Sequence, residues 1–67
     1  MRYLVNVTKG NRRINHFETD SSRTAFEKYF DYVEKVADTE ICGSYSVWVF
    51  DNETGIFLRD LDIVVND

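Results

Sequence analysis

Few side chains in this chain could do covalent chemistry. It contains one histidine, His16, and one cysteine, Cys42, together with Ser44 and Ser46 on one presumed strand. A nucleophilic triad needs a base beside the nucleophile, and no second histidine is available for either serine. His16 could in principle act as a base for Cys42, but nothing in their spacing supports that pairing. The pattern predicts a protein that is not an enzyme, with His16 partly buried and structural and Cys42 a small packing residue.

Ligands for metals and phosphates are also sparse. Asp60, Asp62 and Asp67 are loosely spaced near the end of the sequence, and Asp51 and Glu53 lie in an expected turn. A calcium-binding loop needs a denser pattern, with glycine at its sixth and glutamate at its twelfth position. The sequence has no paired cysteines for zinc and no glycine-rich phosphate loop. We therefore expect solvated acids, no metal and no cofactor.

The charges are unevenly distributed, and the formal net charge is −4. Residues 1–17 contain four basic residues and no acidic one, whereas residues 18–67 contain all twelve acidic residues and four basic ones. Such asymmetry can orient a partner. Lys9, Arg12 and Arg13 are candidates for contacts with phosphate, so a small nucleic-acid-binding protein is the alternative function. The pI of 4.8 and the absence of an RNA-recognition motif argue against this alternative.

One small domain, residues 1–67, must position these groups. A single cysteine precludes an internal disulfide, and the sequence shows neither a signal peptide nor an apolar run near 20 residues. We therefore expect a cytoplasmic protein that does not enter a membrane. A chain this short buries only about 60% of its unfolded surface, so a homodimer that buries a further apolar face is an open alternative.

Alternation in the first third of the chain predicts a β-hairpin. Residues 2–8 alternate between two faces, Gly10-Asn11 supports a two-residue turn, and residues 12–18 return as a second strand. With this register Val5 faces His16, which places the imidazole on the side that a helix would cover.

The middle of the chain predicts one amphipathic helix of about 16 residues that ends near Thr39. Ser21 or Ser22 is the expected N-cap. Apolar residues recur at spacings of three and four and predict the buried stripe Ala25, Phe26, Tyr29, Phe30, Val33, Val36 and Ala37. The acidic residues on the outer side are a second candidate protein contact or, more simply, a solvated helix face: Glu27, Asp31, Glu34 and Asp38.

The last third of the chain predicts a second hairpin. Residues 44–50 are rich in β-branched and aromatic side chains, a turn closed by Gly55 follows, and residues 56–61 return. The tail, residues 61–65, extends the returning strand or pairs elsewhere. The expected fold is α+β, a two-layer ββαββ domain with one helix on one face of an antiparallel sheet of four or five strands.

Both faces of this second hairpin are apolar, although one helix can cover only one face. If Asp51 opposes Ile56, one face carries Trp48, Phe50, Phe57, Arg59 and Leu61, with Trp48 across from Arg59. A bulge would shift this register by one residue. The uncovered face then serves as a homodimer interface, a site for another protein, or a cluster that Ile63 to Val65 cover.

The sequence therefore favours a non-enzymatic protein-binding module, anchored by Trp48, Phe50, Phe57 and Arg59. Short, acidic, proline-free chains without a catalytic set are typical of small accessory proteins of phages and mobile elements. Many of these inhibit a host protein by occupying its surface, and a host protein that handles nucleic acid is the expected target.

Overall fold

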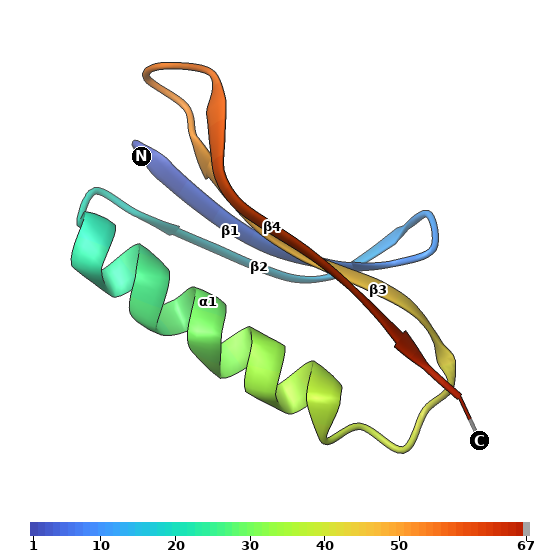
Figure 1. Ribbon diagram of the computed structural model, residues 1–67. Coiled ribbons are helices and arrows are strands. Elements are labelled where there is room, and N and C mark those ends of the chain that lie inside the picture. The colour runs from blue at the N-terminus through green and yellow to red at the C-terminus, as the bar shows by residue number, and fades with distance from the viewer. Residues whose placement is uncertain (67) are drawn as a thin grey trace.

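The computed structural model describes residues 1–66 and confirms the two-layer α+β fold (Figure 1). Strands β1 (Tyr3–Lys9) and β2 (Arg12–Thr19) form the first hairpin, helix α1 (Ser22–Ala37) follows, and β3 (Gly43–Asp51) and β4 (Ile56–Val65) form the second hairpin. The strands make one antiparallel sheet in the order β2-β1-β3-β4, so the hairpins join through β1 and β3. The tail continues β4 along β3, and the described residues form four strands.

Two glycines allow the hairpin turns. Gly10 has a φ of +59° and begins the two-residue turn that connects the paired residues Lys9 and Arg12. Gly55 has a φ of +73° and donates its N–H to the carbonyl of Asp51 at 2.7 Å. The left-handed conformation costs about 1–2 kcal/mol for a residue with a Cβ atom, so both predicted turns depend on glycine.

Helix α1 begins and packs largely as its pattern predicts. The Ser21 side chain is the N-cap and accepts a hydrogen bond from the N–H of Thr24 at 3.2 Å. The buried residues of α1 are Ala25, Tyr29, Tyr32 and Val36, while Phe30 and Ala37, both expected to be buried, are exposed, Phe30 by 60%. Successive side chains of a helix are rotated by about 100° around its axis. A buried stripe centred on Tyr29 and Tyr32 therefore leaves Phe30 on the solvent side.

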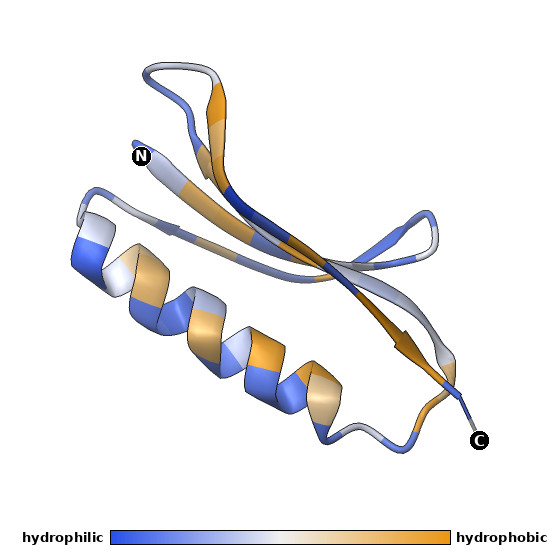
Figure 2. Ribbon diagram, viewed as in Figure 1, coloured by the Kyte–Doolittle hydropathy of each residue, from blue (hydrophilic) through white to orange (hydrophobic). Residues whose placement is uncertain are grey.

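The core lies between α1 and the two central strands. Val5, Val7, Val47 and Val49 are completely buried, and they alternate with residues that point to the opposite face of the sheet. Figure 2 shows the hydrophobic residues along β1 and in recurring bands along α1. The core is therefore a layer of valines from β1 and β3 under the tyrosines of the helix.

A β-bulge in the first hairpin overturns one prediction about a candidate side chain. Thr8 pairs with Arg13 as expected, but Ile14 is an extra residue that the register skips. Because a bulge shifts every following residue by one position, Phe17 takes the place on the core face. His16 was predicted to face the helix, and it points to the opposite face instead.

A second bulge changes the other hairpin. Phe57 pairs with Phe50 as predicted, but Leu58 is the extra residue, so Trp48 pairs with Asp60. Leu58 packs against the core from its position in the bulge. The aromatic residues therefore keep their predicted face, while the residues that follow Leu58 in β4 change theirs.

Candidate functional site

The sheet face opposite α1 is here called the open face, since no other helix or strand of residues 1–66 covers it (Figure 1). Cross-strand pairing arranges its side chains in rows. One row runs Glu18, Leu4, Phe50 and Phe57; the next runs His16, Asn6, Trp48 and Asp60; a third runs Arg13, Thr8, Ser46 and Asp62. Apolar rings thus occupy the β3 and β4 side of the open face, and carboxylates occur at both sheet edges.

Trp48, Phe50 and Phe57 form what we call the aromatic cluster. The ring of Phe57 meets Trp48 edge-on at 5.4 Å between centroids and 79° between planes, and it meets Phe50 at 4.9 Å and 60°. Such pairs contribute about 0.5–1.5 kcal/mol beyond burial. Phe57 is 56% exposed, whereas Trp48 and Phe50 are half-buried. The cluster is ordered by its own contacts and still open to a partner.

A polar chain borders the aromatic cluster. Asn6 lies on the open face but is only 1% exposed, between its cross-strand neighbours His16 and Trp48. Its Oδ1 lies 2.7 Å from Nδ1 of His16, and Nε2 of His16 lies 2.9 Å from a carboxylate oxygen of Glu18. The hydrogen bond from His16 lowers the pKa of the Glu18 carboxyl. His16 is therefore held between two hydrogen-bond partners.

Carboxylates line the β4 edge of the open face. Asp60 lies beside Trp48, and Asp62 accepts a hydrogen bond from the hydroxyl of Ser46. Within residues 1–66, no group of three His, Cys, Asp or Glu side chains is placed to hold a metal ion. Asp67, the last of the three loosely spaced acids near the end of the sequence, lies outside the described residues.

Arg59 does not belong to the aromatic cluster, and the predicted contact between Arg59 and Trp48 is wrong. The bulge at Leu58 turns Arg59 toward the helix, where its guanidinium carbon lies 5.6 Å from the ring centroid of Phe26. Leu61, expected on the same face as Trp48, also lies on the helix side, paired with the buried Val47. The cluster is consequently flanked at β4 by negative charge only.

The acidic residues of α1 lie on the other side of the molecule. Glu27 accepts a hydrogen bond from Arg23 at 3.2 Å, and the other three predicted acids line a shallow cleft of about 350 Å³ with Lys35: Asp31, Glu34 and Asp38. This outer helix face points away from the open face of the sheet (Figure 1). The two predicted protein contacts are therefore separate surfaces that one flat partner cannot cover together.

The basic residues also divide between two faces. Arg13 pairs with Thr8 on the open face, whereas Lys9 and Arg12 line a cleft between the first hairpin and α1. The predicted set of Lys9, Arg12 and Arg13 thus does not form one surface for phosphate groups.

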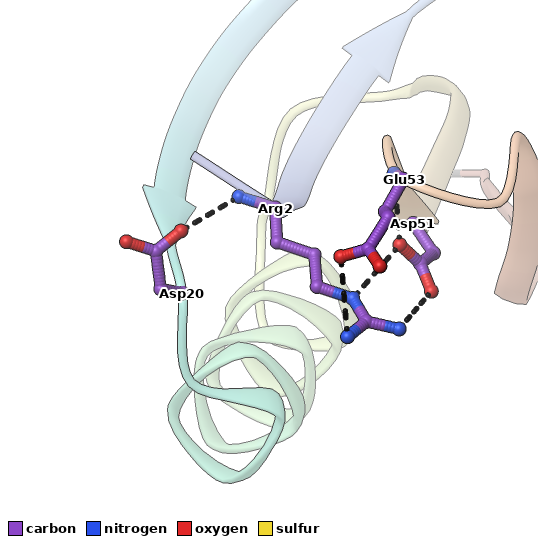
Figure 3. A network of polar contacts seen from close by, with 4 residues as sticks. All are labelled: Arg2, Asp20, Asp51 and Glu53. Atoms are coloured by element: carbon purple, nitrogen blue, oxygen red, sulfur yellow. Dashed lines mark hydrogen bonds and ion pairs between the residues drawn. The ribbon is translucent and has the colours of Figure 1, made fainter.

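An ion-pair network joins the start of β1 to the end of β3, the two central strands of the sheet (Figure 3). Two nitrogens of the Arg2 guanidinium bind the Asp51 carboxylate at 3.2 and 3.0 Å, and a third lies 3.4 Å from Glu53. The backbone N–H of Arg2 donates to Asp20. The Arg2 hydrogen bond lowers the pKa of Asp51. This network fixes the start of β1 against the turn that leads to Phe57.

Leu4, Asn6, Asp60 and Asp62 belong to the open face, although sequence reasoning did not single them out as contact residues. Alternation along β1 does place Leu4 and Asn6 opposite the core valines, so that signal was present. The positions of Asp60 and Asp62 depend on the bulge at Leu58 and had no comparable signal.

Comparison with known proteins yields no relative. No family model, no curated protein and no solved structure matches the chain. No described helix has the length and apolar character needed to cross a membrane.

Proposed function

We propose that this protein is a non-enzymatic binding module that docks onto another protein through the open face. The observation that carries the proposal is an ordered aromatic cluster on an uncovered sheet face, with Phe57 more than half exposed. Aromatic side chains are enriched in the energetically dominant parts of protein interfaces. Leu4 extends the apolar surface toward β1, and Asn6 and His16 supply a polar border.

The charges around the cluster favour a partner with a basic and apolar surface. Asp60 and Asp62 line the β4 edge, and Glu18 lies at the β2 edge of the same face. Complementary charge speeds association and selects among partners. Proteins that handle nucleic acid present such basic surfaces, so occupying one of them would inhibit its owner.

A second copy of this chain is a poorer partner for the open face. In a two-fold, face-to-face dimer, each edge meets either its own copy or the opposite edge. When like edges meet, Asp60 and Asp62 face their own copies and repel them. When opposite edges meet, they face a β2 edge that carries both Glu18 and Arg13, so the charges largely cancel. Charge therefore opposes one dimer arrangement and adds little to the other.

A capture experiment with two matched phenylalanine variants tests the proposal. The tagged chain, Phe57→Ser and Phe30→Ser are each incubated with nuclease-treated lysate of the host cell, and retained proteins are identified by mass spectrometry. Both phenylalanines are similarly exposed, at 56% and 60%, but only Phe57 lies on the open face. We expect one stoichiometric protein to bind the wild type and Phe30→Ser and to be lost from Phe57→Ser.

Other outcomes would refute the proposal in distinct ways. Loss of the partner from both variants, or from neither, would show that the partner does not bind specifically through the open face. Recovery of nucleic acid before nuclease treatment, with no protein afterwards, would favour the basic residues instead. A concentration-dependent dimer in sedimentation that Phe57→Ser abolishes would identify a second copy as the partner.

A further inference from the structure

A basic cleft lies on the opposite side of the sheet from the open face. It has a volume of about 330 Å³ and lies between the first hairpin and the C-terminal half of α1. This volume is within the range of about 300–1,000 Å³ typical of small-molecule sites. Its charged lining residues are Lys9, Arg12 and Lys35, and no Asp or Glu of residues 1–66 lines it. The cleft is thus a positive region of a chain whose net charge is −4.

None of these three cations is neutralised by the described part of the chain. Over residues 1–66, Lys9, Arg12 and Lys35 form no ion pair and no side-chain hydrogen bond. Lys35 also borders the neighbouring acidic cleft, so Lys9 and Arg12 are the cations that belong to the basic cleft alone. Like charges gathered in one cleft repel one another, and a bound anion would relieve that repulsion.

Lys9 is held at the cleft by its neighbours. Its ammonium nitrogen lies 5.8 Å from the ring centroid of Tyr45, which is a cation–π geometry. Its stem crosses Gly43, where an added Cβ atom would lie 2.6 Å from Cε of Lys9. Glycine at position 43 therefore makes the space in which Lys9 lies along Tyr45.

The rest of the lining is mainly apolar. Ile14, the extra residue of the first bulge, lies on one side and Ile41 on the other, and they are 41% and 62% exposed. Val36 and the ring of Tyr32 form the helix side, and both residues are buried. A ligand that fits must therefore combine an anionic head with an apolar body.

We propose that this cleft binds a small amphipathic anion, a carboxylate or phosphate with an aliphatic or aromatic body. The head lies among Lys9, Arg12 and Lys35, and the body lies against Ile14 and Ile41. A nucleic-acid backbone is a poorer fit, because it would need a continuous basic stripe and Arg13 points to the open face.

Octanoate and its uncharged analogue 1-octanol are suitable probes, each titrated into ¹⁵N-labelled protein and followed by NMR. We expect saturable shifts with octanoate at the amides of Ile14, Thr39 and Ile41, and much smaller shifts with octanol. Anionic lipid vesicles, added separately, distinguish a free anion from a membrane lipid as the source of the ligand: co-sedimentation with vesicles would identify the lipid.

Three variants test the role of the cations. An exposed ion pair contributes about 0.2–1 kcal/mol, so Lys9→Gln or Arg12→Gln should each weaken octanoate binding by up to about fivefold. Arg13→Gln makes the same charge change on the open face and should leave binding unchanged. Gly43→Ala displaces the Lys9 side chain but keeps its charge, so it should weaken binding less than Lys9→Gln does.

Either of two results would overturn the inference. One is equal binding of octanoate and octanol, or no saturable shift with either, because the cleft would then not select an anion. The other is an equal effect of Arg13→Gln and Arg12→Gln, which would mean that octanoate binding depends on the net charge of the protein and not on the cleft. Neither result tests the proposed docking of a protein on the open face, which depends on the comparison of Phe57→Ser with Phe30→Ser.

Discussion

The ring of Phe57 meets the ring of Trp48 edge-on, with centroids 5.4 Å apart, on a sheet face that no helix of residues 1–66 covers. Phe57 comes from β4 and Trp48 from β3, and because Phe57 pairs directly with Phe50, the rings of Phe57 and Trp48 are diagonal rather than directly opposite neighbours. Phe57 therefore shields one side of the tryptophan while exposing more than half of its own surface.

Phe57→Ala should expose Trp48 and lower stability modestly. An edge-on aromatic pair contributes about 0.5–1.5 kcal/mol, so we expect the free energy of unfolding in urea to fall by about 1 kcal/mol or slightly more. Trp48 is the only tryptophan, so its emission maximum should shift to longer wavelength in the folded protein. Phe30→Ala is the control and should leave the emission unchanged. An unshifted spectrum for Phe57→Ala would contradict the contact.

The stability should depend on pH through Asp51. The pKa of this carboxyl is lowered from 3.8 in the folded state, chiefly by the hydrogen bond from Arg2. A lowered folded-state pKa contributes stability that is present above the unfolded pKa and is lost as the pH falls through the folded one. We expect the urea midpoint to fall as the pH drops from about 5 to below 3.8.

Asp51→Asn should reduce stability at neutral pH and flatten this acid dependence. The comparison of urea midpoints at pH 6, 4.5 and 3 measures both effects. Glu53→Gln is the matched control within the same network (Figure 3), since Glu53 is far more exposed and contacts Arg2 at 3.4 Å. An acid dependence that Asp51→Asn leaves intact would assign the effect to other carboxyls.

Ser21→Ala should destabilise α1, whereas Ser22→Ala should not. The Ser21 side chain accepts the N–H of Thr24, and Ser22 is the first residue of the helix. Loss of an N-cap hydrogen bond costs about 0.5–2 kcal/mol. Circular dichroism at the helix band during thermal unfolding compares the two variants. Equal melting temperatures would show that the cap does not stabilise the helix.

Asp60→Asn with Asp62→Asn should slow association with the captured partner. Charges at an interface edge act mainly on the association rate and on its salt dependence. We expect a several-fold lower association rate constant at low salt and a smaller difference at 0.5 M salt, where the Debye length is only a few ångströms. Asp31→Asn with Glu34→Gln removes the same charge from the helix face and should have no such effect. Surface plasmon resonance measures all three proteins.

The two hairpins and the helix follow from local patterns that the sequence displays. Gly10 and Gly55 mark the turns, and Ser21 marks the start of the helix, because each satisfies a backbone requirement within a few residues. The valines of β1 and β3 identify the core face, because the side chains of a strand alternate between two faces whichever strands it pairs with. The surplus of aromatic residues in the second hairpin likewise predicted an uncovered apolar face.

The sequence by itself thus determined the elements, the core and the presence of an aromatic surface, whereas the tertiary structure decided which charges surround that surface. The bulge at Ile14 moves His16 to the open face, and the bulge at Leu58 moves Arg59 to the helix side. No glycine or other local sequence signal marks either bulge. A bulge forms where the packing of a whole strand gains by skipping one residue, here by turning Phe17 in β2 and Ile63 and Val65 in β4 toward the core. That gain depends on partners far along the chain, so only the assembled sheet reveals it.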